Sequence, residues 1–303
     1  MNSFINSSSI LSLRIKCPQC KEEIKKENKN NLFMYCNSCK FKINFDSEIW
    51  DFRINSSSRP EFSKQWKLWS DGWLGSKKML YSTSLNENSI DSILKILDLS
   101  KETISNKKFL DIGFGTGRNL SFLYEYSNNV FGIDLIKPIK IFKLNPQSLI
   151  CGDLFNIPLI KNQFDVVICQ GVIHHNKKID LAFKKVIEQI KPGGLLYLYI
   201  YEKRSPKIQK IRKLFPLSWL YPTIIKIFIS HILGSFLSII KIIKENNISN
   251  YKMYHGNYTL GVYDSLSPRW VKTFKPNDVL SCLEKNLLEA KRVSPSVYIG
   301  KKK

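Results

Sequence analysis

Four cysteines near the start of the chain occur in two pairs that could bind a metal ion. Cys17 and Cys20 form the first pair, Cys36 and Cys39 form the second, and fifteen residues separate the pairs. This spacing fits the C-x2-C-x15–20-C-x2-C pattern of a tetrahedral zinc site. Four sulfur ligands leave no open coordination position, so we expect a structural rather than a catalytic Zn2+. The alternative is four free thiols in a segment that has lost its metal.

A second candidate site lies in the stretch FLDIGFGTGRNLSFL, residues 109–123. Three glycines alternate behind an aspartate, between an apolar run and a helical pattern. A glycine-rich turn between a strand and a helix lets the backbone approach a ligand closely, although an ordinary tight turn has the same composition. The dinucleotide fingerprint G-x-G-x-x-G/A does not fit, because its sixth position requires a small residue and is Arg118 here.

The pattern D-x-G-x-G-x-G resembles motif I of the class I S-adenosylmethionine (SAM)-dependent methyltransferases, of the methyltransferase type 11-like kind. Further segments resemble the family in the family's order: VFGIDL (130–135), CGDLFNIP (151–158), FDVVICQGVIHH (164–175) and IKPGGLLYLYIY (190–201). The resemblance is dense from 107 to 201 and loose towards the C-terminus. It implies SAM as the cofactor, bound by Asp111, Gly113, Gly115, Gly117, Asp134, Asp153 and Gln170.

Two of these acids have roles that the resemblance specifies. Asp134 ends the second strand of the domain, where a carboxylate can accept both ribose hydroxyls. Asp153 is implied to meet the adenine amino group. Each has a plainer alternative, since Asp134 could cap a helix and a Gly-Asp pair is also typical of turns.

The catalytic candidates are two adjacent histidines, His175 and His174, which follow the fourth strand of the domain. Methyl transfer depends mainly on positioning, and a base is needed only when the acceptor is still protonated. A neutral imidazole could take the proton of a hydroxyl acceptor, and we favour His175 for this role. The alternative is that both rings only line the pocket or cap the next helix. The chain lacks the N/D-P-P-Y/F/W signature of amine and amide methylation, which lowers the case for a nucleobase amine.

Alternating strands and helices must position these residues. We expect strands at 108–112, 130–134, 148–151, 164–169 and 194–201, with helices at about 117–126, 137–143 and 178–190. The fold class is α/β, a Rossmann-like seven-stranded methyltransferase sheet with a small N-terminal zinc ribbon and a helical insertion, or lid. The expected domains are a zinc-ribbon-like unit at 1–55 and a methyltransferase domain at 61–303, with the insertion at 202–275. A helix at 276–287 and strands near 288–293 and 296–300 close the chain.

Within the insertion, the stretch 211–243 is strongly apolar, with Lys226 and His231 interrupting it. We interpret it as a buried helical lid; a membrane-surface element is the next choice and a spanning helix the last. A polar stretch with several tyrosines, to Pro268, is assigned no element of its own. There "VYDSLSPRW" (262–270) is interpreted as a turn that closes the insertion, with a place in the pocket as the alternative.

The net charge is +22, but only eight of the 47 basic residues are arginine and the charge is spread along the chain. A nucleic-acid partner therefore stays open without being favoured. Seven cysteines and no export signal favour a reducing, cytoplasmic location, with peripheral membrane contact as an open option.

Together these features favour a SAM-dependent methyltransferase that acts on a small-molecule, lipid-like or glycan acceptor, at oxygen or carbon. Two alternatives remain: an RNA methyltransferase that grips RNA with its ribbon, and a SAM-binding regulator without catalysis. Ribbons of this kind resemble those fused to some bacterial methyltransferases, including one group that modifies ribosomal RNA. The oligomeric state does not follow from the sequence.

Overall fold

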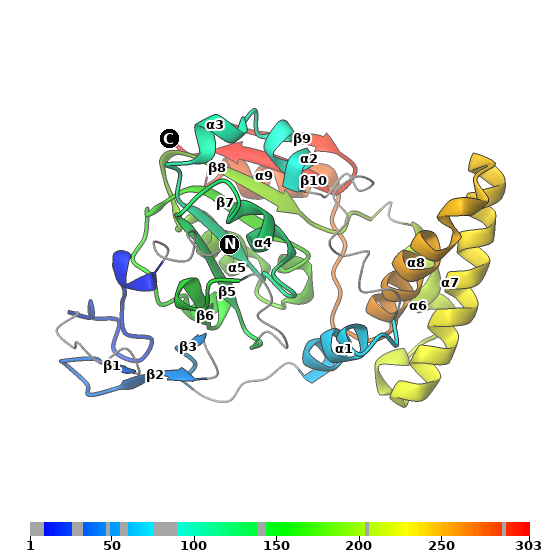
Figure 1. Ribbon diagram of the computed structural model, residues 1–303, viewed down its shortest axis with the longest axis horizontal. Coiled ribbons are helices and arrows are strands. Elements are labelled where there is room, and N and C mark those ends of the chain that lie inside the picture. Colours follow the sequence, from blue (N-terminus) through cyan, green and yellow to red (C-terminus); the bar gives the residue numbers. More distant parts are fainter. Residues whose placement is uncertain are drawn as a thin grey trace. The chain divides into compact units, whose positions relative to one another are not determined.

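The structure is a computed structural model that describes residues 9–25, 33–46, 49–54, 60–74, 90–137, 144–203, 206–286 and 289–303. The chain divides into two compact units. The first consists of residues 1–58, 86–202 and 272–303, and the second of residues 59–85 and 203–271 (Figure 1). The helix expected at 137–143 lies, apart from Lys137, outside the described residues.

The first unit is built on one mixed sheet, which has ten strands in the described part of the chain. In spatial order these are β1 (Phe33–Tyr35), β2 (Lys42–Asp46), β3 (Ile49–Asp51), β6 (Leu149–Cys151), β5 (Val130–Asp134), β4 (Phe109–Ile112), β7 (Phe164–Gln170), β8 (Ile190–Tyr199), β10 (Val297–Lys301) and β9 (Glu289–Ser294). Strands β3 to β8 pair in parallel, and the two edges are antiparallel. The α/β, Rossmann-like architecture expected from the sequence is confirmed.

The central strands form because short apolar runs end at turn residues, as the sequence pattern indicates. Counted from β4 along the chain, the seven strands β4 to β10 lie in the order 3-2-1-4-5-7-6. The strand order reverses next to β4, which pairs with β5 on one side and β7 on the other. In such sheets ligands bind at this reversal, outside the carboxyl ends of the strands.

Helices cover the two faces of the sheet, and alternate residues of each strand face opposite cores. Leu110 and Ile112 belong to one buried cluster and Phe109 to the other. The first cluster includes residues of α5 (Ile179–Ile187) and α9 (Pro276–Glu284), and the second those of α2 (Ile90–Ile96), α3 (Lys101–Ile104) and α4 (Arg118–Leu123). Helix α5 forms because Ile179, Ala182, Phe183, Val186 and Ile187 share one face.

The N-terminal segment continues the sheet, which accounts for three strands beyond the seven that were expected. Trp50 of β3 pairs in parallel register with Ile150 of β6. The backbone also bridges Ile15 to Leu159, and the side chains of Ile10, Ile15 and Trp50 are buried in the same cluster as the central strands. An edge strand exposes unpaired backbone groups, and β3 satisfies those of β6. Whether residues 1–55 fold as a domain of their own stays a prediction.

The second unit is helical. It contains α1 (Pro60–Ser70), α6 (Pro206–Leu214), α7 (Thr223–Glu245) and α8 (Tyr251–Leu266), and α6, α7 and α8 lie side by side (Figure 1). Trp69, Leu74, Ile227 and Tyr263 form a small core. Among the described helices, α7 alone is long and apolar enough to cross a membrane by length and composition.

The insertion differs from the sequence interpretation in two respects. Residues 251–266 form helix α8, so the interpretation of 262–270 as a turn is wrong for its first five residues. Tyr263 is buried in this helix, and Asp264 accepts a hydrogen bond from Gln65 of α1 at 3.1 Å. The interpretation of 211–243 as a buried helix is also wrong for one whole face of α7, whose side chains are exposed.

Candidate functional site

The glycine turn between β4 and α4 has a backbone conformation that residues with side chains rarely adopt. Gly113 and Gly117 have φ of 78° and 77°, in the left-handed region. A Cβ atom on Gly113 would lie 2.1 Å from Cγ2 of Val172, and one on Gly117 would lie 2.5 Å from Cδ1 of Leu144. A larger residue at either position would be strained and would displace Val172 or Leu144, so glycine is favoured and the turn brings bare backbone to the carboxyl end of β4.

Asp111 lies beside this turn at the end of β4 and is buried, with 2% of its surface exposed. Its Oδ2 accepts a hydrogen bond from Nδ2 of Asn119 at 3.2 Å, and the same amide nitrogen donates to Oε1 of Gln170 at 2.7 Å. Asn119 comes from α4 and Gln170 from the last position of β7. The structure thus joins Asp111 and Gln170, two of the predicted residues, through a third residue that was not predicted.

The environment of Asp111 disfavours its charge. Burial raises the pKa of Asp111 to about 7, and the nearby Asp134 carboxyl adds to the rise, while the hydrogen bond from Asn119 opposes it. Oδ1 of Asp111 and Oδ1 of Asn119 are both buried without a hydrogen-bond partner among the described residues. Two buried acceptors and a carboxyl ready to ionise fit a ligand group that is positively charged or donates hydrogen bonds.

Asp134 ends β5 and holds the glycine turn in place. Its Oδ2 accepts a hydrogen bond from the backbone N–H of Gly115 at 2.8 Å, and its Oδ1 accepts one from Ile136 at 3.0 Å. Burial raises the pKa of Asp134 although these bonds favour the ionised form. The carboxyl therefore lies directly against the turn, at the same sheet edge as Asp111.

Asp153 has a local structural role. It precedes a short 3-10 helix, Leu154–Asn156, and its Oδ1 accepts a hydrogen bond from the backbone N–H of Phe155 at 2.9 Å. This role in a turn is the alternative that the sequence analysis gave for Asp153. The implied contact with adenine stays a prediction. Asp153 follows β6, which pairs in parallel with β5, so it lies on the same edge of the sheet as Asp134.

The two histidines form a short 3-10 helix, Ile173–His175, after β7. The His174 ring is fully buried and stacks on Tyr201, with centroids 3.7 Å apart. Nδ1 of His174 accepts a hydrogen bond from the backbone N–H of Tyr201 at 3.3 Å. Burial, and to a lesser degree His175, lower the pKa of His174 well below its ordinary value, so the ring is neutral. We therefore assign its proton to Nε2, which is buried with no partner among the described residues.

His175 is a neighbour of this stack rather than part of it. Its ring centroid lies 4.3 Å from that of His174 and 5.9 Å from that of Tyr201. It is 5% exposed, and its backbone N–H donates to Val172, the residue that abuts Gly113. The histidine segment is thus linked to the glycine turn through Val172, and its two rings belong to an aromatic wall that Tyr199 and Tyr201 extend.

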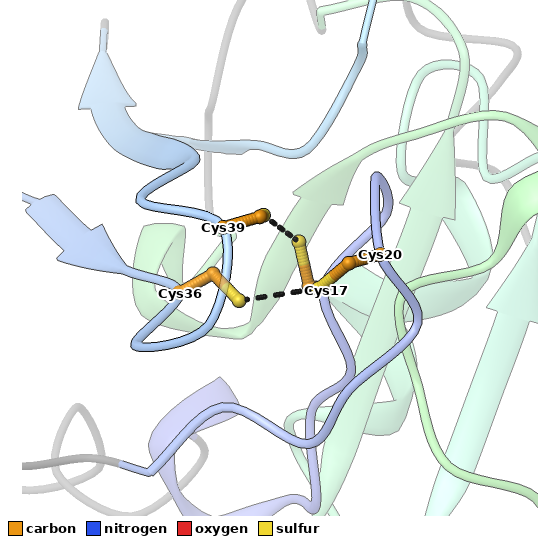
Figure 2. A group of neighbouring side chains, drawn as sticks. All are labelled: Cys17, Cys20, Cys36 and Cys39. Atoms are coloured by element: carbon orange, nitrogen blue, oxygen red, sulfur yellow. Dashed lines mark hydrogen bonds between the residues drawn. The ribbon is translucent and has the colours of Figure 1, made fainter.

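The four cysteines converge on one point, as Figure 2 shows. Their sulfur atoms all lie within 4.8 Å of one another, with Cys17 to Cys39 at 3.5 Å and Cys20 to Cys36 at 3.4 Å. Ligands of a tetrahedral zinc with Zn–S bonds of about 2.3 Å would be about 3.8 Å apart, so the four sulfurs fit that ion.

The two pairs have the same local structure, which explains why they converge. Each reads Cys-x-x-Cys-Lys, and each lysine has a positive φ, 72° at Lys21 and 61° at Lys40. The backbone N–H of each lysine donates to the carbonyl of the first cysteine of its pair, Cys17 or Cys36. Two such turns facing each other bring the four thiols to one point.

Comparison with known proteins classifies the central segment. Residues 110–198 match the family model described as "Methyltransferase domain". This segment is similar to a methyltransferase domain. It contains the glycine turn, all three acids, Gln170 and both histidines, whereas the cysteine cluster and the helical unit lie outside it.

Proteins that are similar to this chain are named as methyltransferases of different kinds. A Mus musculus protein named "Probable tRNA methyltransferase 9B" is 30% identical over 113 residues, which cover 35% of this chain and 25% of that protein. The ubiquinone biosynthesis O-methyltransferase of Rickettsia typhi is 26% identical over 152 residues, covering 47% of this chain and 60% of that protein. A SAM-dependent methyltransferase structure from Thermotoga maritima has a TM-score of 0.46 and 13% identity, covering 80% of this chain and 97% of that one. The matched part of the chain thus spans about a quarter of the length of the Mus musculus relative and about three fifths of the length of the Rickettsia typhi relative.

Proposed function

We propose that the protein is a SAM-dependent methyltransferase. The observation that carries the proposal is the pair of buried acceptors, on Asp111 and Asn119, beside a glycine turn in a methyltransferase domain. A bound SAM would supply the electrophilic methyl group of its sulfonium. Its ammonium and sulfonium are the kind of positive groups that the Asp111 carboxyl would favour, and the bare turn between Gly113 and Gly117 would admit its chain.

Asp134 would bind the ribose in this arrangement. Each oxygen of its carboxylate already accepts one backbone N–H, which orients the group and leaves further acceptor capacity for two hydroxyls. Asp153 would meet the adenine from the neighbouring strand end, and Gln170 would act through Asn119 by fixing its amide. Apart from Asn119, which comes from α4, these residues come from the carboxyl ends of adjacent parallel strands or the turns after them.

For the acceptor, we propose a small-molecule, lipid-like or glycan hydroxyl, or a carbon. His174 would act as a hydrogen-bond donor, because its Nδ1 already accepts the Tyr201 N–H and its Nε2 carries the proton. His175 would be the base that takes the hydroxyl proton, because it is 5% exposed whereas His174 is fully buried. The aromatic wall of Tyr199, Tyr201 and His174 favours an acceptor with an apolar or flat surface.

The cysteine cluster would hold one structural Zn2+. Four converging sulfurs in two matching turns support this, and the metal would join the turns of a segment that borders the 151–160 loop. Lys16 donates its backbone N–H to Pro158, and Nδ2 of Asn156 donates to Pro18, so the ribbon segment and this loop support each other. Cysteines kept as thiolates on a metal agree with a cytoplasmic location, which we also propose.

An RNA acceptor is the second candidate. It is favoured by the name of the Mus musculus relative and by the net charge of +22. A regulator that binds SAM without turnover is the third. To separate them, the purified protein is incubated with methyl-labelled SAM and cell extract divided into RNA, protein, lipid, glycan and small-molecule fractions. Label in the lipid, glycan or small-molecule fraction supports the proposal, label in RNA replaces it, and no label in any fraction favours the regulator.

SAM binding itself is tested by Asp134→Ala. Removing a charged hydrogen-bonding group costs about 1.5–3 kcal/mol, so we expect a loss of about tenfold to a hundredfold in SAM affinity by calorimetry. Asp165→Ala is the matched control: Asp165 also accepts a backbone N–H, that of Lys108 at 2.8 Å, but at the opposite end of the strands. Equal affinity in wild type and Asp134→Ala would contradict the assignment of the ribose site.

A further inference from the structure

Helix α7 exposes large apolar side chains and buries small residues, which is the reverse of what a helix with one face in water normally does. Fourteen of the seventeen large hydrophobic side chains exposed in the described residues lie in the helical unit, so exposure is concentrated there. Seven follow one stripe along α7, which is formed by Ile224, Ile225, Phe228, Ile232, Phe236, Ile239 and Ile243. The positions are three or four residues apart, apart from the adjacent pair at the start, so they form one continuous face. We call this stripe the α7 apolar face.

The opposite side of α7 is made of small residues that pack against α8. Ser230, Gly234 and Ser238 recur every four residues and are buried. The packing is close, because a Cβ atom on Gly234 would lie 2.4 Å from Oγ1 of Thr259 and 2.9 Å from its backbone nitrogen. Small residues between helices and large apolar residues outside are typical of helices surrounded by lipid, and the reverse of a helix in water.

The polar residues that interrupt the α7 sequence do not interrupt the apolar face. The Lys226 side chain is buried, and its Nζ donates to the Trp219 carbonyl at 3.1 Å. Nε2 of His231 lies 2.9 Å from the Trp73 carbonyl. Both polar groups are thus satisfied inside the helical unit, and neither belongs to the exposed stripe.

Charge identifies the kind of surface that would cover this face. Residues 203–271 contain eleven lysines and arginines but only two acidic residues. Exposed basic side chains flank α7 along the chain, with Lys210 and Lys213 before it and Lys244 and Lys252 after it. Exposed apolar residues continue past the helix at Leu214, Leu217, Leu220 and Ile248. A second copy of so basic a segment would be repelled, whereas an anionic bilayer would attract the lysines and accept the apolar face.

Two tryptophans and an arginine meet near the start of α7, since Trp219 lies four residues before the helix begins. The guanidinium of Arg269 lies 4.8 Å from the ring centroid of Trp219 and 5.7 Å from that of Trp270, which is 46% exposed. Tryptophan with a neighbouring cation is characteristic of the boundary between headgroups and acyl chains. We infer that the α7 apolar face is a membrane-docking surface that lies in the headgroup region of an anionic lipid bilayer.

The docking is along the surface and not across the bilayer, because α8 accompanies α7. Helix α8 has only 16 residues, about 24 Å, and its exposed residues include Lys252 and Asn257. A spanning α7 would draw these groups into hydrocarbon about 30 Å thick, where each is costly. Lying flat, the α7–α8 pair keeps α8 in water and inserts the opposite face. The inference does not depend on methyl transfer or on its acceptor.

The test is co-sedimentation of the full chain with vesicles of phosphatidylcholine and phosphatidylglycerol, and with phosphatidylcholine alone. We expect binding to the anionic vesicles that weakens between 0.1 M and 1 M salt, as screening predicts. Phe228→Asp/Phe236→Asp should lower the partition coefficient by at least about tenfold, since two inserted aromatic rings are lost. Both side chains are exposed, at 66% and 60%, so the fold should be retained.

The matched control is Ile54→Asp/Val293→Asp, which changes two similarly exposed residues of the other unit. It should bind vesicles like wild type, and circular dichroism and SAM affinity should be unchanged in both double variants. Absence of vesicle binding by the wild type overturns the inference. So does a dimer in light scattering that Phe228→Asp/Phe236→Asp dissociates, because the face would then bind a second copy. Membrane-bound protein that resists carbonate and needs detergent would instead show a spanning helix.

Discussion

Asp111 should release a proton when a positively charged ligand binds beside it. Its pKa is raised to about 7 by burial, with a contribution from Asp134. A cationic group next to the carboxyl would return the pKa towards its ordinary value, so the protonated fraction is lost on binding. With a pKa of about 7, that fraction is about 0.9 at pH 6, about 0.5 at pH 7 and about 0.1 at pH 8. SAM binding should release about these numbers of protons.

The measurement is titration calorimetry of SAM binding in buffers of different ionisation enthalpy, whose slope gives the protons exchanged. Asp111→Asn keeps the shape of the side chain and removes its titration, so the slope at pH 6 should fall close to zero. S-adenosylhomocysteine is the ligand control, because it has the same amino group and no sulfonium. The same slope in wild type and Asp111→Asn, or no proton release at pH 6, would refute the reasoning.

The same group makes the stability of the ligand-free protein depend on pH. Between about pH 4 and pH 7 the unfolded chain has lost the Asp111 proton while the folded chain keeps it, so the free energy of unfolding falls as the pH rises. A shift from 3.8 to about 7 corresponds to about 4 kcal/mol across this window. Asp111→Asn should lack this part of the pH dependence in urea unfolding. A steeper loss of stability in the variant than in wild type would contradict the assignment.

Two further predictions concern the metal and the histidines. Elemental analysis should find about one zinc per chain. Cys36→Ser should lower this to about zero, because three thiolates with one open position no longer make a closed site. Cys282→Ser, which lies outside the cluster, is the control, and a zinc-free wild type with an ordered ribbon would contradict this interpretation. His175→Ala should lower turnover about 10²–10⁴-fold if the acceptor is a hydroxyl, with SAM affinity within about threefold of wild type. Near-normal turnover in His174→Ala, His175→Ala and the double variant would mean that positioning alone carries the reaction.

The central sheet could be predicted because its strands are local in sequence. Short apolar runs such as FDVVIC, each followed by a turn, have one stable environment, a sheet covered on both faces. The five central strands differ from their predicted bounds mainly at β8, which begins four residues early at Ile190. There the turn signal of Pro192 and Gly193 lies inside the strand, and the strand irregularity between β7 and β8 accommodates it.

Features that depend on distant partners could not be predicted. Asn119 follows Arg118 in a helix that begins at the glycine turn, and nothing local says that its amide points to Asp111 rather than to water. The joining of β3 to β6 brings together residues a hundred positions apart. The tautomer of His174 depends on the backbone N–H of Tyr201, 27 residues away. In each case the hydrogen-bond partner of a polar group is set by residues that are distant in the sequence, and motif spacing does not reveal that partner.

The orientation of α7 shows this limit most clearly. Its apolar content predicts a helix and suggests burial, yet which of its faces is buried depends on α8. Helix α8 was not recognised, because its apolar residues follow no helical period and tyrosines, glycines and polar residues alternate along it. Those small and polar residues of α8 allow close packing against Ser230, Gly234 and Ser238 of α7, a row that we call the α7 seam. Once the seam is on the inside, the isoleucines and phenylalanines can only face outward. A sequence that looks like a core helix therefore becomes a surface that only an apolar environment can cover.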